Sequence, residues 1–373
     1  MPSPPSMRSE LLRLMGDPGS APALTPAQWS RLLPVARQAR LLGRLAHAVQ
    51  GAGVLPAVPD GPRRHLTGAL RLVAAHHRDV RAEVAHIMEA LKDLGAPVVL
   101  LKGAAYVLGD LPAADGRLFT DTDVMVPAAA LNRAESLLAL AGWVPAKSDA
   151  YDTLYYRRWM HQVPPLVHFR RGTVLDLHHT LVPPTARVAL EASHVFGAAR
   201  PLPGVPGAWL PAPADMVLHS AAHLFNEGMF NNALRDLSDM DRLLRHFGAT
   251  EPEFWDNLPA RARRLDMETP LAHALIAARS LLGTPVPEAA AARLMARTGL
   301  GPRLLSPVFD AALQPAHPAC RGRGAAAAVG FLYLRGHWMR MPLRHLVPHL
   351  TRKAWRAVLE GLHADTTSQR AMR

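Results

Sequence analysis

The spacing of apolar residues changes twice along the chain and divides it into three parts. Up to residue 95 these residues return every three or four positions, and the longest such run covers residues 65–94 and stops before Gly95. Short continuous apolar runs follow, and helical spacing then returns to the end of the chain. We therefore predict an N-terminal helical region (1–95), a mixed core (96–210) and a C-terminal helical region with a basic tail (211–373).

Local signals place some element boundaries. Thr25 is a suitable N-cap with Pro26 at the first helical position, so a helix is expected to begin there. The proline-rich segment from Val182 to Pro213 is expected to be a linker with one short helix.

The middle region combines strand and helix patterns. PVVLLKG and DTDVMVP are short apolar runs closed by glycine or proline, which is typical of buried strands, and a short helix is expected over 104–110 between them. A helix follows over 127–142, and then YDTLYYRRW, PPLVHFR and TVLDLHHTL are predicted as strands. The pattern favours an α+β protein with a mixed sheet.

Composition and charge restrict the class of protein. The single cysteine, Cys320, excludes an internal disulfide framework and a zinc ribbon. Since no apolar run has the length of a signal peptide or a membrane span, a cytoplasmic protein without a transmembrane segment is expected. The net charge of +12 favours polyanionic partners such as nucleotides, nucleic acid or an anionic membrane, although a GC-rich coding bias toward arginine explains it equally well.

Three aspartates form the main chemical pattern. Asp121 and Asp123 are two residues apart on one predicted strand, so both carboxylates face one side, about 7 Å apart along the chain. Asp176 is an acid inside a second apolar strand, where it needs a partner or a metal. Three carboxylates fit a two-metal phosphoryl-transfer centre with Mg²⁺ or Mn²⁺ as the ions. A solvated turn explains most isolated D-x-D sequences, and Asp176 could instead be an edge residue paired with an arginine.

Four further residues are predicted to assist this centre. Lys102, one of only four lysines, and Gly103 end the first strand, where a charged side chain and backbone N–H groups meet phosphate oxygens. Arg117 is a second phosphate-binding candidate. His178 follows Asp176 and is expected to orient it or a ligand, although a packed histidine explains it about as well.

Other polar residues have simpler explanations. His219 and His223 have a zinc-compatible spacing, but the glutamate of H-E-x-x-H is absent, so structural packing is favoured. One later predicted helix carries the charged residues Arg235, Asp236, Asp239 and Asp241. They are expected to form ion pairs along its face, and Arg235 or Asp239 is a candidate to line the cleft.

The segments LLKGAAYVLGD, RLFTDTDVMVP and VLDLHHTL resemble a bacterial nucleotidyltransferase family, usually labelled uncharacterised, of the DNA polymerase β superfamily. The later segments DMVLHSAAHLF and LRDLSDMDRLL and the tail WMRMPLRHLVPHLTRKAWR are similar to its helical regions. The resemblance implies a nucleotidyltransferase fold, Mg²⁺, an NTP donor and release of pyrophosphate, with Asp121, Asp123 and Asp176 as metal ligands. The chain departs from the family pattern at Ala104, where a serine is usual, and at His179, where an aromatic residue is usual.

The predicted function is transfer of a nucleoside monophosphate, by default AMP from ATP, to a hydroxyl or phosphate acceptor. Similar proteins lie beside natural-product clusters, so the resemblance implies a peptide or small natural product as one acceptor class. Two alternatives remain: a glycosyltransferase whose D-x-D holds a nucleotide sugar, and a degenerate nucleotide- or RNA-binding module whose binding weakens with salt. Docking of the basic tail on anionic lipid is a further reading, and core packing explains that segment more simply.

Overall fold

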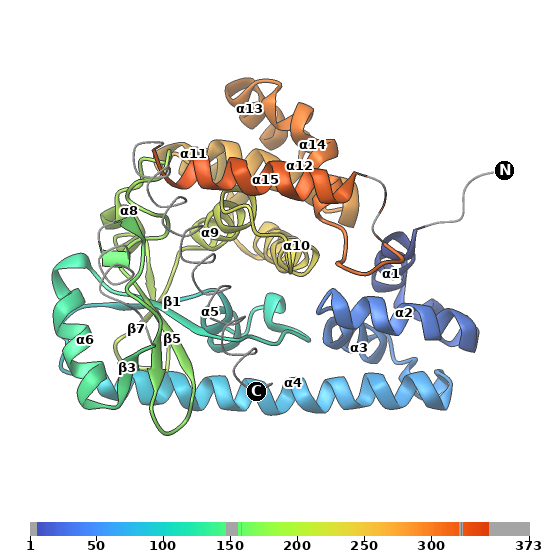
Figure 1. The fold of residues 1–373 in the computed structure, drawn as a ribbon, viewed down its shortest axis with the longest axis horizontal. Helices are drawn as coiled ribbons and strands as arrows, with labels where there is room; N and C mark the ends of the chain where they lie inside the picture. The colour runs from blue at the N-terminus through green and yellow to red at the C-terminus, as the bar shows by residue number, and fades with distance from the viewer. Residues whose placement is uncertain (1–5, 147–155, 158, 321, 323, 343–373) are drawn as a thin grey trace, which may run out of the picture.

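The structure is a computed structural model that describes residues 6–146, 156–157, 159–320, 322 and 324–342. One long helix, α4 (Asp60–Ala90), joins its parts (Figure 1). The N-terminal half of α4 contacts α2 (Pro26–Gln38) and α3 (Leu42–Gly51), and α4 also contacts α5 (Lys102–Leu108) and α6 (Leu131–Leu140) of the core. Its buried positions recur at helical spacing, as the sequence predicts.

Short helices pack beside the start of α4 around a cluster of their own. Trp29, Leu32 and Leu45 are fully or almost fully buried there. Thr25 caps the second helix with a capping box, so the predicted start of that helix is confirmed. The elements before α4 are α1 (Met7–Gly16), η1 (Pro18–Ala23), α2 (Pro26–Gln38), α3 (Leu42–Gly51) and η2 (Leu55–Ala57).

Seven strands of the described residues form one mixed sheet in the order β3-β4-β5-β2-β1-β7-β6. β2 pairs with β5 in parallel and with β1 in antiparallel orientation, so the central strands come from three separate segments. Their bounds are β1 (Val98–Leu101), β2 (Thr122–Met125), β3 (Trp143–Pro145), β4 (Leu166–His168), β5 (Val174–His178), β6 (Arg200–Pro201) and β7 (Ala208–Leu210). The predicted α+β class with a mixed sheet is confirmed.

Short helices connect these strands and cover the sheet. Between β1 and β3 lie α5 (Lys102–Leu108), η3 (Pro112–Ala114), η4 (Ala128–Ala130) and α6 (Leu131–Leu140), and α8 (Ala192–Phe196) precedes β6. Two expectations need correction. The prediction of a linker with one helix over 182–213 was incomplete, because this segment also supplies the edge strand β6 and its neighbour β7, which sequence periodicity does not reveal in such short pieces. The predicted strand 151–159 lies mostly outside the described residues, and Tyr156 and Arg157 within it are helical.

Helices fill the C-terminal region, as predicted. They are α9 (Pro213–Asn226), α10 (Ala233–Thr250), α11 (Phe254–Arg264), α12 (Glu268–Leu282), α13 (Glu288–Thr298), α14 (Gly301–Ala312) and α15 (Ala325–Arg340). Their buried side chains join those of the sheet in one hydrophobic core. Every described helix is too short or too polar to cross a bilayer. Beyond α15, most of the basic tail lies outside the described residues.

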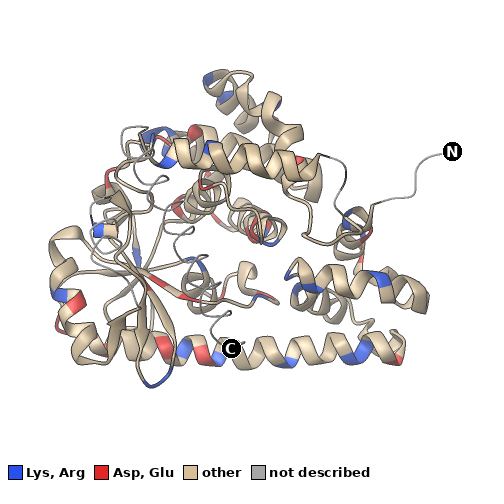
Figure 2. Ribbon diagram, in the orientation of Figure 1, with Lys and Arg blue, Asp and Glu red and all other residues tan. Residues whose placement is uncertain are grey.

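Charged residues are spread over all three regions. Figure 2 shows basic residues on helices from each part of the chain, with acidic residues among them.

Candidate active site

Two acidic side chains lie side by side at the centre of the sheet. The parallel pairing of β2 and β5 places Asp123 opposite Asp176, with the neighbouring pairs Thr122–Leu175 and Val124–Leu177 in the same register. Since side chains of paired residues project to the same face of a sheet, the two carboxylates share one side. The fully buried Leu175 and Leu177 fix the opposite face of β5 in the core.

His178 joins these two aspartates. One donor atom each from Asp123, Asp176 and His178 lies within 4.8 Å of the others, and this is the metal-competent group found in the described part of the chain. The fully buried His178 follows Asp176 by two residues and directs its Nε2 to Asp123 Oδ1 at 3.1 Å. The group thus contains two of the three predicted aspartates together with a histidine.

Asp123 is held as an anion. Lys102 Nζ donates to Asp123 Oδ1 at 2.9 Å, and the carboxylate is 3% exposed while the lysine side chain is 26% exposed. Burial alone would raise the pKa of Asp123, but Lys102 and His178 more than offset this effect and lower it far below its usual range. The same contact raises the pKa of Lys102 although burial lowers it.

Asp176 is in a different electrostatic situation. Its Oδ1 is buried and has no hydrogen-bond partner in the structure. Burial, followed by the nearby negative charge of Asp123, raises the pKa of Asp176 from 3.8 to about 6. An unpaired buried carboxylate oxygen beside other ligand atoms is suited to bind a cation.

Asp121 lies outside this tight group. It occupies a bend immediately before β2, is exposed, and accepts a hydrogen bond from Thr120 Oγ1 at 3.3 Å. Asp121 does line the same pocket as Asp123 and Lys102. It therefore stands at the mouth of the site, because the strand that would align it with Asp123 begins one residue later.

Close packing explains Gly103. A Cβ at this position would lie 2.1 Å from Cδ1 of Phe119, so only glycine fits beneath that ring. Lys102, immediately before it, adopts a positive φ of 42°, which turns the chain from β1 into α5. The glycine thus allows the segment before β2 to approach α5 closely.

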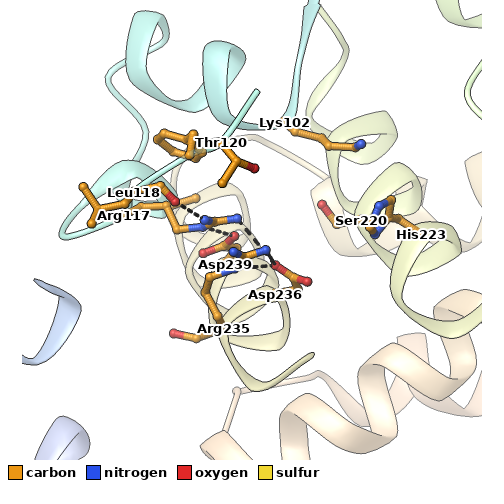
Figure 3. Close-up of polar contacts among 12 residues, drawn as sticks. Lys102, Arg117, Leu118, Thr120, Ser220, His223, Arg235, Asp236 and Asp239 are labelled. Carbon is orange, nitrogen blue, oxygen red and sulfur yellow. Dashed lines mark hydrogen bonds and ion pairs between the residues drawn. The ribbon is translucent and has the colours of Figure 1, made fainter. Parts of the chain in front are cut away.

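Arg117 is engaged by α10. Its Nε donates to Asp239 at 2.8 Å, its Nη2 lies 3.5 Å from Asp236, and its Nη1 donates to the carbonyl of Leu118 (Figure 3). Asp239 also accepts from Arg44 of α3 at 2.9 Å. Arg117 therefore ties the segment before β2 to α10, and Asp239 links α10 to α3 through Arg44. No sequence pattern indicates the Arg44 contact, which spans 195 residues.

The other sequence predictions for this region meet mixed outcomes. Of the ion pairs expected along α10, Arg235–Asp236 at 2.6 Å and Arg245–Asp241 at 2.7 Å are present. Asp239 instead pairs with Arg44 and Arg117 from outside the helix. His219 is buried beside the ring of His178, with ring centroids 6.4 Å apart, and burial is the main cause that lowers its pKa well below the usual value. His223 lies 3.4 Å from Glu227.

A pocket of about 210 Å³ opens beside Asp123, between the start of β2 and the helices α5, α9 and α10. Figure 3 shows Lys102, Ser220 and His223 facing it on one side and the Arg117–Asp239 contacts on the other. Basic and acidic side chains both line it, including Arg117, Arg235, Asp236 and Asp239.

A family model described as uncharacterised nucleotidyltransferase matches residues 25–283. The match includes all three predicted aspartates and the helices α9 and α10. No curated protein and no solved structure matches the chain.

Proposed function

This chain belongs to the family of uncharacterised nucleotidyltransferases, and from that premise we propose that it is a metal-dependent enzyme of the DNA polymerase β-like superfamily. It transfers a nucleoside monophosphate from an NTP, by default AMP from ATP, to a hydroxyl or phosphate acceptor. Pyrophosphate is the second product.

One observation supports this proposal above the others: Asp123 and Asp176 are register partners on adjacent parallel strands. Their side chains, with His178, bring three ligand atoms within 4.8 Å of one another, and Asp176 Oδ1 is buried without a partner. Carboxylate oxygens suit Mg²⁺, and a set that includes imidazole also suits Mn²⁺. The residues present therefore fit a divalent cation, which Asp123, Asp176 and His178 would hold, with Asp121 at its edge.

A divalent cation bound there would neutralise charge on the triphosphate and on the transferred phosphoryl group. Lys102, partly exposed at the pocket, supplies a fixed positive charge for the triphosphate. Gly103 allows the close approach of the chain around the phosphates. Arg117 orients the segment that carries Asp121 through its bonds to α10.

Asp176 is suited to accept the proton of the attacking hydroxyl. Without a bound cation, the pKa of Asp176 is about 6, closer to neutral pH than that of an ordinary aspartate. Asp123 remains ionised over the same range because Lys102 and His178 lower its pKa.

The proposal is tested by incubating the protein with each labelled NTP, Mg²⁺ or Mn²⁺ and a cell extract as the acceptor source. We expect pyrophosphate release and label transfer, and loss of both in Asp123→Asn and Asp176→Asn, while the exposed variant Asp79→Asn stays active. Full activity in Asp123→Asn would refute the assignment. Activity of Asp176→Asn with a sugar nucleotide would instead support the glycosyltransferase alternative, and salt-sensitive binding of RNA without pyrophosphate release would support the degenerate binding module.

A further inference from the structure

A second cavity lies on the other side of the segment that precedes β2. It is a groove of about 470 Å³ between the helices α2 and α3, the first half of α4 and residues 116–118. The neighbouring active-site pocket measures only about 210 Å³. Small-molecule sites usually occupy about 300–1,000 Å³, and the groove falls within this range.

Positive charge surrounds the groove. Arg37, Arg40 and Arg64 line it, and the lining contains no acidic residue. Arg37 contacts His65 at 2.8 Å, whereas the guanidinium groups of Arg40 and Arg64 have no hydrogen-bond partner among the described residues. Two unpaired guanidinium groups over one groove favour an anionic ligand.

The wall of the groove is apolar. Leu72 is 57% exposed and Leu118 is 38% exposed, and Leu42 and Val73 also line it. Exposed leucines that face one hollow favour a ligand with an apolar part. The combination indicates a small molecule with an apolar body and a negatively charged group.

The segment 116–121 separates the two cavities. Gly116 and Leu118 line the groove, whereas Arg117, Phe119, Thr120 and Asp121 line the active-site pocket. Figure 3 shows the Leu118 side chain directed away from Lys102 and Ser220. A ligand in the groove therefore lies one backbone segment away from the acidic group.

This segment is held tightly against α3. A Cβ on Gly43 would lie 2.4 Å from the carbonyl oxygen of Gly116, so the two backbones touch. From α4, His77 Nε2 lies 2.9 Å from the Arg117 carbonyl oxygen, and the Phe119 N–H donates to His76 Nε2. The groove and the active site consequently share a rigid wall.

We propose that the groove binds a small amphipathic organic anion. The anionic group pairs with Arg40 and Arg64, and the apolar body lies on Leu72 and Leu118.

Charge argues against an occupant from the chain itself. Residues 343–373 contain six Lys or Arg residues and two acidic residues, so this segment would be repelled by the arginines of the groove. A second copy of the chain, with a net charge of +12, is disfavoured for the same reason.

The binding test uses two fluorescent probes of similar shape, the anion 8-anilinonaphthalene-1-sulfonate and the uncharged N-phenyl-1-naphthylamine. In Arg40→Gln/Arg64→Gln we expect the Kd of the anion to rise about tenfold or more, and that of the neutral probe less than twofold. Leu72→Gln should weaken both probes. The matched controls Arg78→Gln, an exposed arginine of α4, and Leu140→Gln, 87% exposed on α6, should change neither.

An unchanged Kd of the anion in the double variant would overturn the groove assignment, whether or not the protein transfers nucleotides. A failure of the proposed function is recognised separately, by activity that survives Asp123→Asn while probe binding to the groove is intact.

Discussion

Replacing Asp176 by asparagine measures how much the ionised carboxylate destabilises the folded protein. In the metal-free protein, burial and the neighbouring Asp123 raise the pKa of the Asp176 carboxyl from 3.8 to about 6. Each pKa unit corresponds to about 1.4 kcal/mol. Ionised Asp176 therefore lowers the free energy of unfolding by up to about 3 kcal/mol.

The effect depends on pH in a defined direction. Below about pH 4, Asp176 is protonated in the folded and the unfolded chain, and its ionisation costs nothing. As the pH rises through about 6 it ionises in the folded chain as well, and the full cost applies. Because asparagine does not ionise, the stability of Asp176→Asn relative to wild type should increase by up to about 3 kcal/mol between pH 4 and pH 8.

Urea unfolding of both proteins in the presence of EDTA, at several pH values over this range, measures the difference. Asp79→Asn, at an exposed position of α4, gives the effect of the same replacement away from the site. A stability difference between Asp176→Asn and wild type that is constant from pH 4 to pH 8 would refute the reasoning. At pH 8, added Mg²⁺ should stabilise wild type more than the variant, since a cation that binds only the folded state shifts unfolding by mass action.

Three further substitutions test how the site is supported. Arg44→Met leaves the buried Asp239 with one arginine fewer and should reduce the free energy of unfolding by about 3 kcal/mol; a loss below about 1 kcal/mol in urea unfolding contradicts this. Gly103→Ala should cost about 1–3 kcal/mol through its clash with Phe119, and adding Phe119→Ala should remove that cost, so additive losses in a double-mutant cycle speak against the contact. Thr25→Ala removes a capping box and should lower stability by about 1 kcal/mol, with an unchanged melting temperature as the opposing result.

Periodicity predicted the parts of the site that depend on local spacing. The alternation along TVLDLHH separates Asp176 from Leu175 and Leu177, and the structure places these residues on opposite faces of β5. The same reasoning identified the buried face of α4. This helix contacts both the N-terminal helices and the core.

Periodicity does not predict contacts between distant segments. Arg44 meets Asp239 across 195 residues, and nothing near either residue signals the other. The strands β6 and β7 were missed because they are only two and three residues long and lie among prolines, at an edge of the sheet where Pro201 needs no ladder hydrogen bond. Such elements form because a neighbouring strand is available, and the sequence alone does not show that neighbour.

The two central aspartates both lie on apolar strands but differ in chemistry. Asp123 receives both Lys102 and His178 on one oxygen, so its charge is fixed at all working pH values. Asp176 lies opposite Asp123 in the register and receives neither contact. Burial and the charge of Asp123 raise its pKa. Without a bound cation, one carboxylate is therefore a permanent anion while its neighbour titrates near neutrality, which separates their protonation behaviour. In this fold the separation follows from which aspartate Lys102 reaches from the turn after β1.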